Sequence, residues 1–196
     1  MTVLNAVLEL GRKEIILDKT ACAVIGVVGF VILTICGAFV RIPLPFTPVP
    51  ITLQTFSVLL AGAILGRRLG SISQTIYIIL GALGLPIFSG AVGGLSRLFG
   101  PTGGYLIGFV LAAWVIGRLI GGKKASFLKI LSIMFAGEVV LFSLGVIWLS
   151  MVLHVTLIKA VFLGLLPFIP GDAIKLLAAT TLYYEIQGRV RGIYSE

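Results

Sequence analysis

The sequence predicts an all-α integral membrane protein: a six-transmembrane-helix bundle with both termini in the cytoplasm. Apolar residues make up 59% of the 196 positions and charged residues only 11%, against roughly 25% charged residues in soluble domains. Three segments, 20–40, 102–120 and 130–149, approach the roughly 20 apolar residues that a membrane-spanning helix requires. The basic residues, in addition, concentrate in alternate loops.

That distribution of basic residues sets the predicted orientation. Only three basic residues, Arg41, Arg97 and Lys159, fall in the loops on one side. Eleven fall on the other side: Arg12, Lys13, Lys19, Arg67, Arg68, Arg118, Lys123, Lys124, Lys129, Arg189 and Arg191. Loops rich in Lys and Arg stay in the cytoplasm, so both termini are expected there and the number of spans is even. The net charge of +8 is explained in this way without nucleic acid as a partner.

Between the basic clusters we expect six helices, at about 20–40, 53–66, 69–88, 102–120, 130–150 and 171–187. The chain is interpreted as one membrane domain, 1–196, with a six-helix core over about 20–187. Residues 1–19 are expected to form a cytoplasmic segment, either an interfacial helix or an unstructured tail, and they lack the features of a cleavable signal peptide. The basic turn at 66–70 predicts a tight hairpin between the second and third helices.

Proline and glycine mark three loops on the external side. The first, 41–50, reads RIPLPFTPVP, and proline both lacks an amide donor and disfavours helix in the residue before it. The other two are the glycine-rich segment 88–101 and the segment 163–171, which holds Pro167 and Pro170. Irregular backbone near membrane depth persists only where it packs in protein or lines a wet cavity. We therefore expect a cavity that these loops cap from outside.

Many of the 25 glycines recur at intervals of four, in the series Gly62, Gly66, Gly70, then Gly100, Gly104, Gly108, and Gly117, Gly121. Such seams let helices approach each other closely. Two interpretations follow, packing within this chain and a docking surface for a partner helix.

Three ionisable residues are candidates for binding a small anionic solute. Asp172 and Lys175 lie at i and i+3 at the start of the last predicted helix and share a face. They could equally be a helix cap and a snorkelling lysine. Arg97 lies in an apolar external loop and either faces solvent or joins the same cavity. If the three meet, the cavity carries a net charge of +1, and one bound carboxylate neutralises it.

Enzymatic chemistry finds little support. His154 is the one histidine, no G-x-S-x-G elbow is present, and no Walker G-x-x-x-x-G-K-[ST] motif occurs. We therefore expect neither an enzyme nor a resident cofactor or metal. Glu138, in the middle of the fifth predicted helix, could bind ligand or a proton, or could form a helix-packing hydrogen bond in its protonated form. A stand-alone proton-coupled secondary transporter is thus a competing hypothesis.

Four segments, in register and in order, resemble the BioY family, the biotin-specific substrate-binding (S) components of energy-coupling-factor (ECF) transporters. They are TPVPITLQT at 47–55, LGALGLPIF at 80–88, GPTGGYLIGF at 100–109 and LPFIPGD at 166–172. The similarity runs from about residue 20 to 185. It implies a six-helix protein of a prokaryotic cytoplasmic membrane that binds biotin from outside. Biotin would be passed inward by toppling, together with a transmembrane coupling (T) subunit and ATP-binding cassette ATPases that hydrolyse ATP.

The resemblance also implies roles for individual residues. Arg97, Asp172 and Lys175 would be the polar site residues. Either Lys175 or Arg97 would bind the valerate carboxylate, and Asp172 would bind a ureido N–H or orient the cations. Further candidates are Ser89 and Tyr105, and Gln54 would hold the first loop over the site.

Two points stay open on this resemblance. The ligand could be another small carboxylated vitamin. S components often show Ala-x-x-x-Ala on the first helix for docking the T subunit, whereas this chain has Cys22-x-x-x-Gly26 and the series Ala21, Ile25, Gly29. The docking face is therefore left open.

Overall fold

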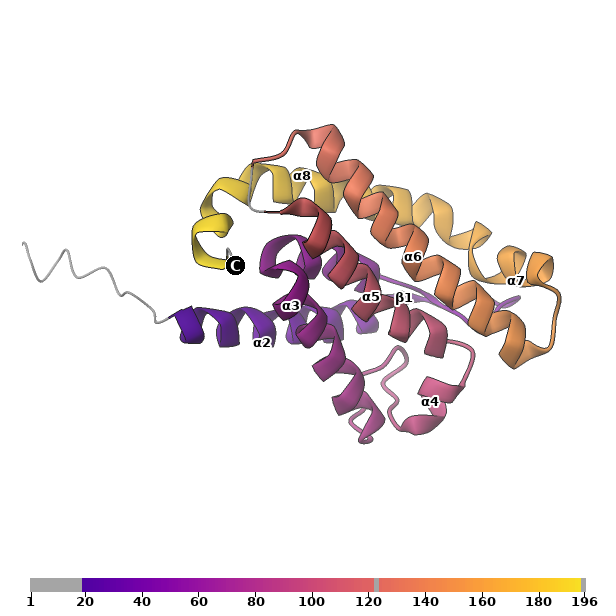
Figure 1. The fold of residues 1–196 in the computed structure, drawn as a ribbon. Helices are drawn as coiled ribbons and strands as arrows, with labels where there is room; N and C mark the ends of the chain where they lie inside the picture. The colour runs from indigo at the N-terminus through magenta and orange to yellow at the C-terminus, as the bar shows by residue number, and fades with distance from the viewer. Residues whose placement is uncertain (1–18, 122–123, 195–196) are drawn as a thin grey trace, which may run out of the picture.

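The computed structural model describes residues 19–121 and 124–194, so the expectation for 1–19 lies outside the described residues except at Lys19. Helices dominate the described chain (Figure 1). In order, the elements are α2 (Lys19–Phe39), strands β1 (Arg41–Ile42) and β2 (Ile51–Thr52), α3 (Gln54–Ala82), α4 (Leu95–Phe99), α5 (Gly103–Ile120), α6 (Phe127–Leu153), α7 (Leu157–Gly164), a single 3-10 turn η1 (Leu166–Phe168) and α8 (Ile169–Tyr194).

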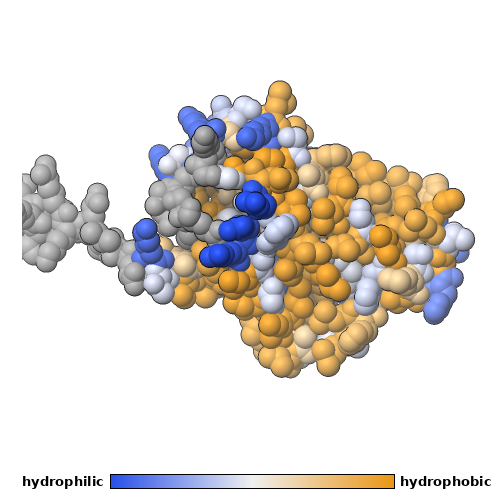
Figure 2. All heavy atoms as spheres, in the orientation of Figure 1, coloured by the Kyte–Doolittle hydropathy of each residue, from blue (hydrophilic) through white to orange (hydrophobic). Residues whose placement is uncertain are grey.

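Several of these helices have the length and apolar composition of membrane spans. Within residues 19–121 and 124–194, five helical stretches qualify: α2, α3, α5, α6 and the stretch Leu157–Val190, which includes α7 and most of α8. Figure 2 shows hydrophobic residues covering most of the visible face. The chain is therefore a multi-pass membrane protein, as its composition predicts.

Gly66 interrupts α3 near its middle. Its backbone angles are φ 80° and ψ −177°, a conformation that suits glycine and strains other residues. A Cβ added at Gly70 would lie 2.8 Å from the carbonyl oxygen of Ala61. In a straight helix these two residues would be separated by about 13.5 Å, at about 1.5 Å per residue. The chain therefore bends sharply back at the predicted basic turn, but one glycine rather than a five-residue loop makes the bend.

Several helix boundaries differ from the sequence prediction, and one helix was not predicted. The helix expected over 69–88 ends at Ala82, because Gly84 adopts φ 104° and Pro86 follows. The segment after α6 contains a helix that was not predicted, α7, whose first turn is capped by Thr156: its hydroxyl accepts from the Lys159 N–H at 3.4 Å. The last helix begins at Ile169, two residues early, and continues to Tyr194.

The helices pack closely along glycine positions. The most extensive contacts join α3 to α5, α5 to α6 and α2 to α3. A Cβ added at Gly104 would lie 2.2 Å from the Trp148 Cβ, and one added at Gly117 would lie 2.2 Å from the Arg67 amide nitrogen. Gly104 and Gly117 therefore serve packing within the chain, whereas a Cβ added at Gly66 or Gly121 would meet nothing within 4 Å.

The two ends of the bundle differ in character. The start of α2 and the C-terminal end of α8 lie together at one end, where hydrophilic residues gather (Figures 1 and 2). Loop 41–53, α4 and α7 lie toward the other end (Figure 1). In that loop β1 pairs with β2 in antiparallel register, Arg41 opposite Thr52, and the proline-rich stretch between the two strands is non-helical, with turns and bends. The three irregular loops thus meet at one end, where they can enclose a cavity.

Candidate ligand-binding site

A cavity of about 180 Å³ lies beneath these loops, between α3, α5, α6 and α8. All six predicted site residues line it: Gln54, Ser89, Arg97, Tyr105, Asp172 and Lys175. The proline-rich loop contributes its backbone turn from Pro43 to Pro50, and aromatic side chains of α5, α6 and η1 form much of the remaining wall. The chamber expected from the sequence is therefore present.

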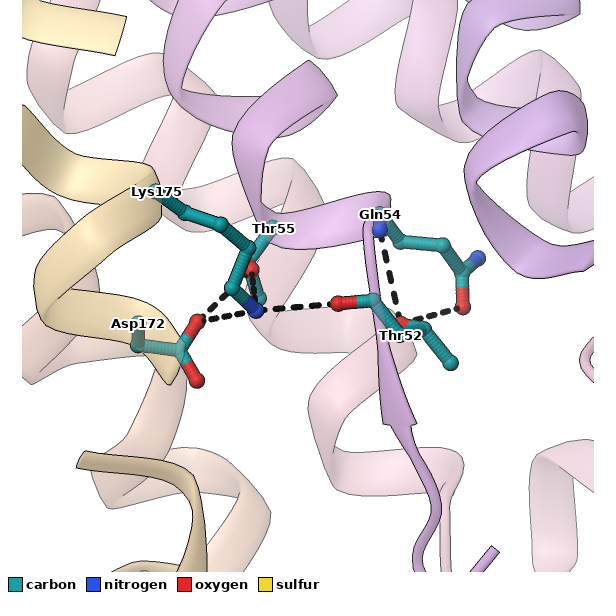
Figure 3. Close-up of polar contacts among 5 residues, drawn as sticks. All are labelled: Thr52, Gln54, Thr55, Asp172 and Lys175. Carbon is teal, nitrogen blue, oxygen red and sulfur yellow. Dashed lines mark hydrogen bonds and ion pairs between the residues drawn. The ribbon is translucent and has the colours of Figure 1, made fainter. Parts of the chain in front are cut away.

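Lys175 is held by three oxygen atoms (Figure 3). Its Nζ donates to the Thr52 carbonyl oxygen at 2.9 Å and to the Thr55 Oγ1 at 2.6 Å, and lies 2.6 Å from the Asp172 Oδ1. An ammonium group has three N–H donors. The residue is 8% exposed, and each of its side-chain donors has a partner within the protein. Lys175 therefore has no donor left for a ligand in this conformation.

Asp172, in contrast, has one carboxylate oxygen available to accept a hydrogen bond from a ligand. Its Oδ1 accepts from the Thr55 hydroxyl at 2.7 Å and pairs with Lys175. Its Oδ2 is buried and has no hydrogen-bond partner among the residues that the structure describes. A carboxylate in its charged form has about four acceptor positions, so an unused buried oxygen is costly unless a ligand supplies a donor. The geometry suits an N–H donor on the ligand.

Gln54 connects the first loop to α3. Its Nε2 donates to the Tyr77 hydroxyl at 2.7 Å, and its Oε1 accepts from the Thr52 hydroxyl at 3.2 Å. Tyr77 in turn donates to the Ile87 carbonyl oxygen at 3.3 Å. This chain of hydrogen bonds ties loop 41–53 to the loop after α3, which agrees with the role expected for Gln54.

Ser89 and Tyr105 contribute in different ways. The Ser89 Oγ is buried and has no partner among the described residues, so it is free to bond a ligand. The Tyr105 hydroxyl already donates to the Gly164 carbonyl oxygen at 2.7 Å. Its ring stands edge-on to Phe142, with centroids 6.1 Å apart, and presents an apolar wall.

Two arginines stand at the mouth of the cavity. Arg97, on α4, and Arg41, on β1, are both exposed and both line it. Within the described chain neither guanidinium has a hydrogen-bond or ion-pair partner. A Cβ added at Gly90 would lie 2.7 Å from the Arg41 Nη1, so Arg41 reaches across to the 88–101 loop. The net charge of +1 expected from the sequence omitted Arg41: three cations and Asp172 give the cavity +2.

Known proteins resemble this chain along most of its length. The BioY family profile matches residues 12–192. The chain belongs to the BioY family. It is 44% identical to the biotin transporter BioY of Thermotoga maritima over 153 residues, which cover 78% of this chain and 88% of that protein. It is 39% identical to the biotin transporter BioY of Rhizobium etli over 159 residues, covering 77% and 84%.

A solved structure agrees with this membership. The crystal structure of the S component for biotin from an ECF-type ABC transporter superposes with a TM-score of 0.78 and 29% sequence identity, covering 96% of this chain and 95% of that one. The BioY relatives are named as transporters and not as enzymes.

Some lining residues of this BioY-family chain were not predicted. Thr55 joins the two charged groups of α8, and a threonine in the first turn of an apolar helix gives a usable but unspecific signal. Tyr77 packs edge-on to Phe88 with centroids 5.5 Å apart, a tertiary contact that no local pattern indicates. Arg41 had a signal, because it opens the proline-rich loop that covers the cavity. Glu138, considered as a ligand contact, does not line the cavity.

Proposed function

We propose that this chain is the biotin-binding S component of an ECF transporter. The observation that carries the proposal is the buried trio Thr55, Asp172 and Lys175 beneath two unpaired arginines, in one cavity of a BioY-family protein. Biotin offers complementary chemistry: a carboxylate, a neutral ureido group with two N–H donors and one carbonyl, and an apolar ring and chain between them.

The donor inventory of the cavity favours one orientation of the ligand. Lys175 is fully engaged, so the carboxylate belongs to Arg97, with Arg41 as the second cation. The Oδ2 of Asp172 is free to accept a ureido N–H. Ser89 is available to donate to the ureido carbonyl, and the rings of Tyr105 and its neighbours cover the apolar part. Of the two cations that the resemblance offers for the carboxylate, Lys175 and Arg97, the geometry favours Arg97, and Lys175 holds Asp172 in place.

The +2 charge of the cavity accounts for preference among ligands. A monoanionic ligand lowers the charge of the site from +2 to +1, and it forms charge-assisted hydrogen bonds, which are stronger than neutral ones. An uncharged ligand of equal shape would leave two guanidinium groups without partners. The cavity therefore distinguishes ligands by their carboxylate and by the N–H donor at the other end of the molecule.

The membrane arrangement belongs to the same proposal. The break at Gly66 turns the five long helical stretches into six spans of one membrane domain, with both termini cytoplasmic. Lys19 begins α2, Arg118 lies in the last turn of α5 and Arg189 lies near the end of α8, and these helix ends lie away from loop 41–53 (Figure 1), which supports that orientation. The cavity would then open outward from the cytoplasmic membrane of a prokaryote. The chain would act with a T subunit and ATP-binding cassette ATPases, which would hydrolyse ATP.

The test is calorimetric titration of biotin, lipoate and riboflavin into purified protein, together with mass spectrometry of small molecules retained through purification. We expect tight binding of biotin alone. Asp172→Asn should abolish it, and Arg189→Gln, a change of an exposed residue remote from the cavity, should not. A folded protein that binds another carboxylated vitamin and ignores biotin would redirect the proposal. Uptake into liposomes that lack any ATPase would support the stand-alone transporter instead.

A further inference from the structure

A second cavity, of about 540 Å³, lies between α6, α7 and α8. Its wall is almost wholly apolar, and it shares two residues, Phe142 and Asp172, with the ligand cavity. These two residues therefore form the partition between the two chambers. Glu138, one turn before Phe142 on α6, lines only the second chamber, which we call the lateral groove.

Two carboxylate oxygens at the lateral groove have no partner. Glu138 is 7% exposed and Asp172 is 3% exposed. Among the residues that the structure describes, Glu138 Oε1 and Asp172 Oδ2 are buried without a hydrogen bond. A charged carboxylate in the middle of a membrane-spanning helix costs about 2.5–3.5 kcal/mol even on insertion scales, and such groups mark ion or proton pathways. When Glu138 is ionised the groove therefore holds a negative charge, and no basic residue that the structure describes lines the groove to balance it.

Within the described chain, no ionisable residue on the neighbouring helices supplies a cation that could pair with Glu138 in the groove. Asp172 of α8 lines the groove together with Glu138, and Lys175 of α8 is already committed to Thr52, Thr55 and Asp172. The described ionisable residues of α6 itself and of the other helices packed against it do not line the groove: Lys129 on α6, Arg67, Arg68 and Tyr77 on α3, Tyr105 and Arg118 on α5, and Lys159 on α7.

We propose that Glu138 binds a monovalent cation, a proton or a sodium ion, in the lateral groove, and that this binding is coupled to the ligand cavity across Asp172. The coupling rests on the proposed function, because it requires a ligand in the first cavity. The cation site is argued separately, from the two unpaired carboxylate oxygens of Glu138 and Asp172. The Oδ2 of Asp172 has two acceptor positions, so it can face Glu138 and still accept a ligand N–H.

The sign of the coupling follows from charge. A free, ionised Glu138 lowers the positive potential of the ligand cavity, and a bound cation restores it. Cation binding should therefore raise the affinity for an anionic ligand, and ligand binding should raise the affinity for the cation by the same factor. A coupling free energy of about 1.1 kcal/mol, near the lower end of the usual range of about 1–3 kcal/mol, gives a change of about sixfold.

The experiment measures the biotin dissociation constant of the full-length protein along two axes. One is pH between about 6 and 8.5 without sodium, where the ligand carboxylate stays ionised. The other is sodium concentration at fixed pH, with choline chloride holding the ionic strength constant. We expect about sixfold tighter binding at low pH or at high sodium, and whichever axis responds identifies the cation. Glu138→Gln, which has the same shape without the charge, should bind tightly and respond to neither.

His154→Asn is the matched control, because it replaces the one histidine of the sequence and asparagine tolerates the left-handed backbone (φ 52°) at this position. It should keep the full response. A wild-type affinity that changes along neither axis overturns the proposal, and so does a response that survives in Glu138→Gln. If the protein does not bind biotin at all, the proposed function fails. An infrared titration of the carboxyl stretch, compared between wild type and Glu138→Gln without ligand, then decides the cation site alone.

Discussion

Replacing Arg97 by glutamine should weaken biotin binding through the carboxylate alone. A hydrogen bond to a charged group contributes about 1.5–3 kcal/mol. The lower end applies because Arg97 is exposed and Arg41 remains as a second cation at the mouth. About 1.5 kcal/mol corresponds to a rise of about tenfold in the biotin dissociation constant. Biotin amide, which has no negative charge, should bind wild type and Arg97→Gln with equal affinity.

Isothermal titration calorimetry with both ligands measures this difference. Arg189→Gln, the same exchange at an exposed site remote from the cavity, serves as the control and should change neither affinity. Lys175→Gln should weaken both ligands to the same extent, because Lys175 orients Asp172 and does not reach the carboxylate. The reasoning is refuted if Arg97→Gln weakens biotin and biotin amide equally, or if Lys175→Gln spares the amide.

Three further substitutions test the packing and hydrogen bonds around the site. Thr55→Val removes the hydroxyl that links the carboxylate and ammonium of α8. We expect the free energy of unfolding to fall by about 1.5 kcal/mol, seen as a fall of about 3–6 °C in the melting temperature in thermal-shift assays. An unchanged melting temperature would contradict this. Gly104→Ala should lower the melting temperature because the new Cβ would lie 2.2 Å from the Trp148 Cβ, while Gly29→Ala, with nothing within 4 Å, should not. Tyr105→Phe should leave biotin affinity nearly unchanged and speed amide hydrogen exchange in α7; a large loss of affinity would mean that its hydroxyl serves the ligand.

Much of this fold is visible in the sequence because membrane insertion leaves strong patterns. Long apolar segments, basic clusters and proline-rich loops each report a physical constraint that acts locally. The helix ends were harder to predict, since α3 ends at Ala82 where glycine and proline follow inside an apolar run. α7 was missed because eight residues are too few for a span, and only the capping threonine before it signals a helix.

In the site, too, contacts between residues close in sequence could be predicted, whereas contacts made only by folding could not. Asp172 and Lys175 are three residues apart on one helix, so their pairing could be expected from spacing. The third member, Thr55, lies 117 residues from Asp172 in sequence, and only folding brings its hydroxyl to 2.7 Å from that carboxylate. Arg41 was placed among the external basic residues, but its position over Gly90 depends on how two loops meet. Side chains joined by tertiary packing leave no periodic signal in one sequence.

A crystal structure of the protein with bound biotin tests the central claim most directly. The account predicts the ligand carboxylate within hydrogen-bond distance of Arg97 or Arg41 and a ureido N–H on the Asp172 Oδ2, with Lys175 keeping its three present partners. Biotin found outside this cavity, or bound with its carboxylate on Lys175 and no contact to Asp172, would contradict it.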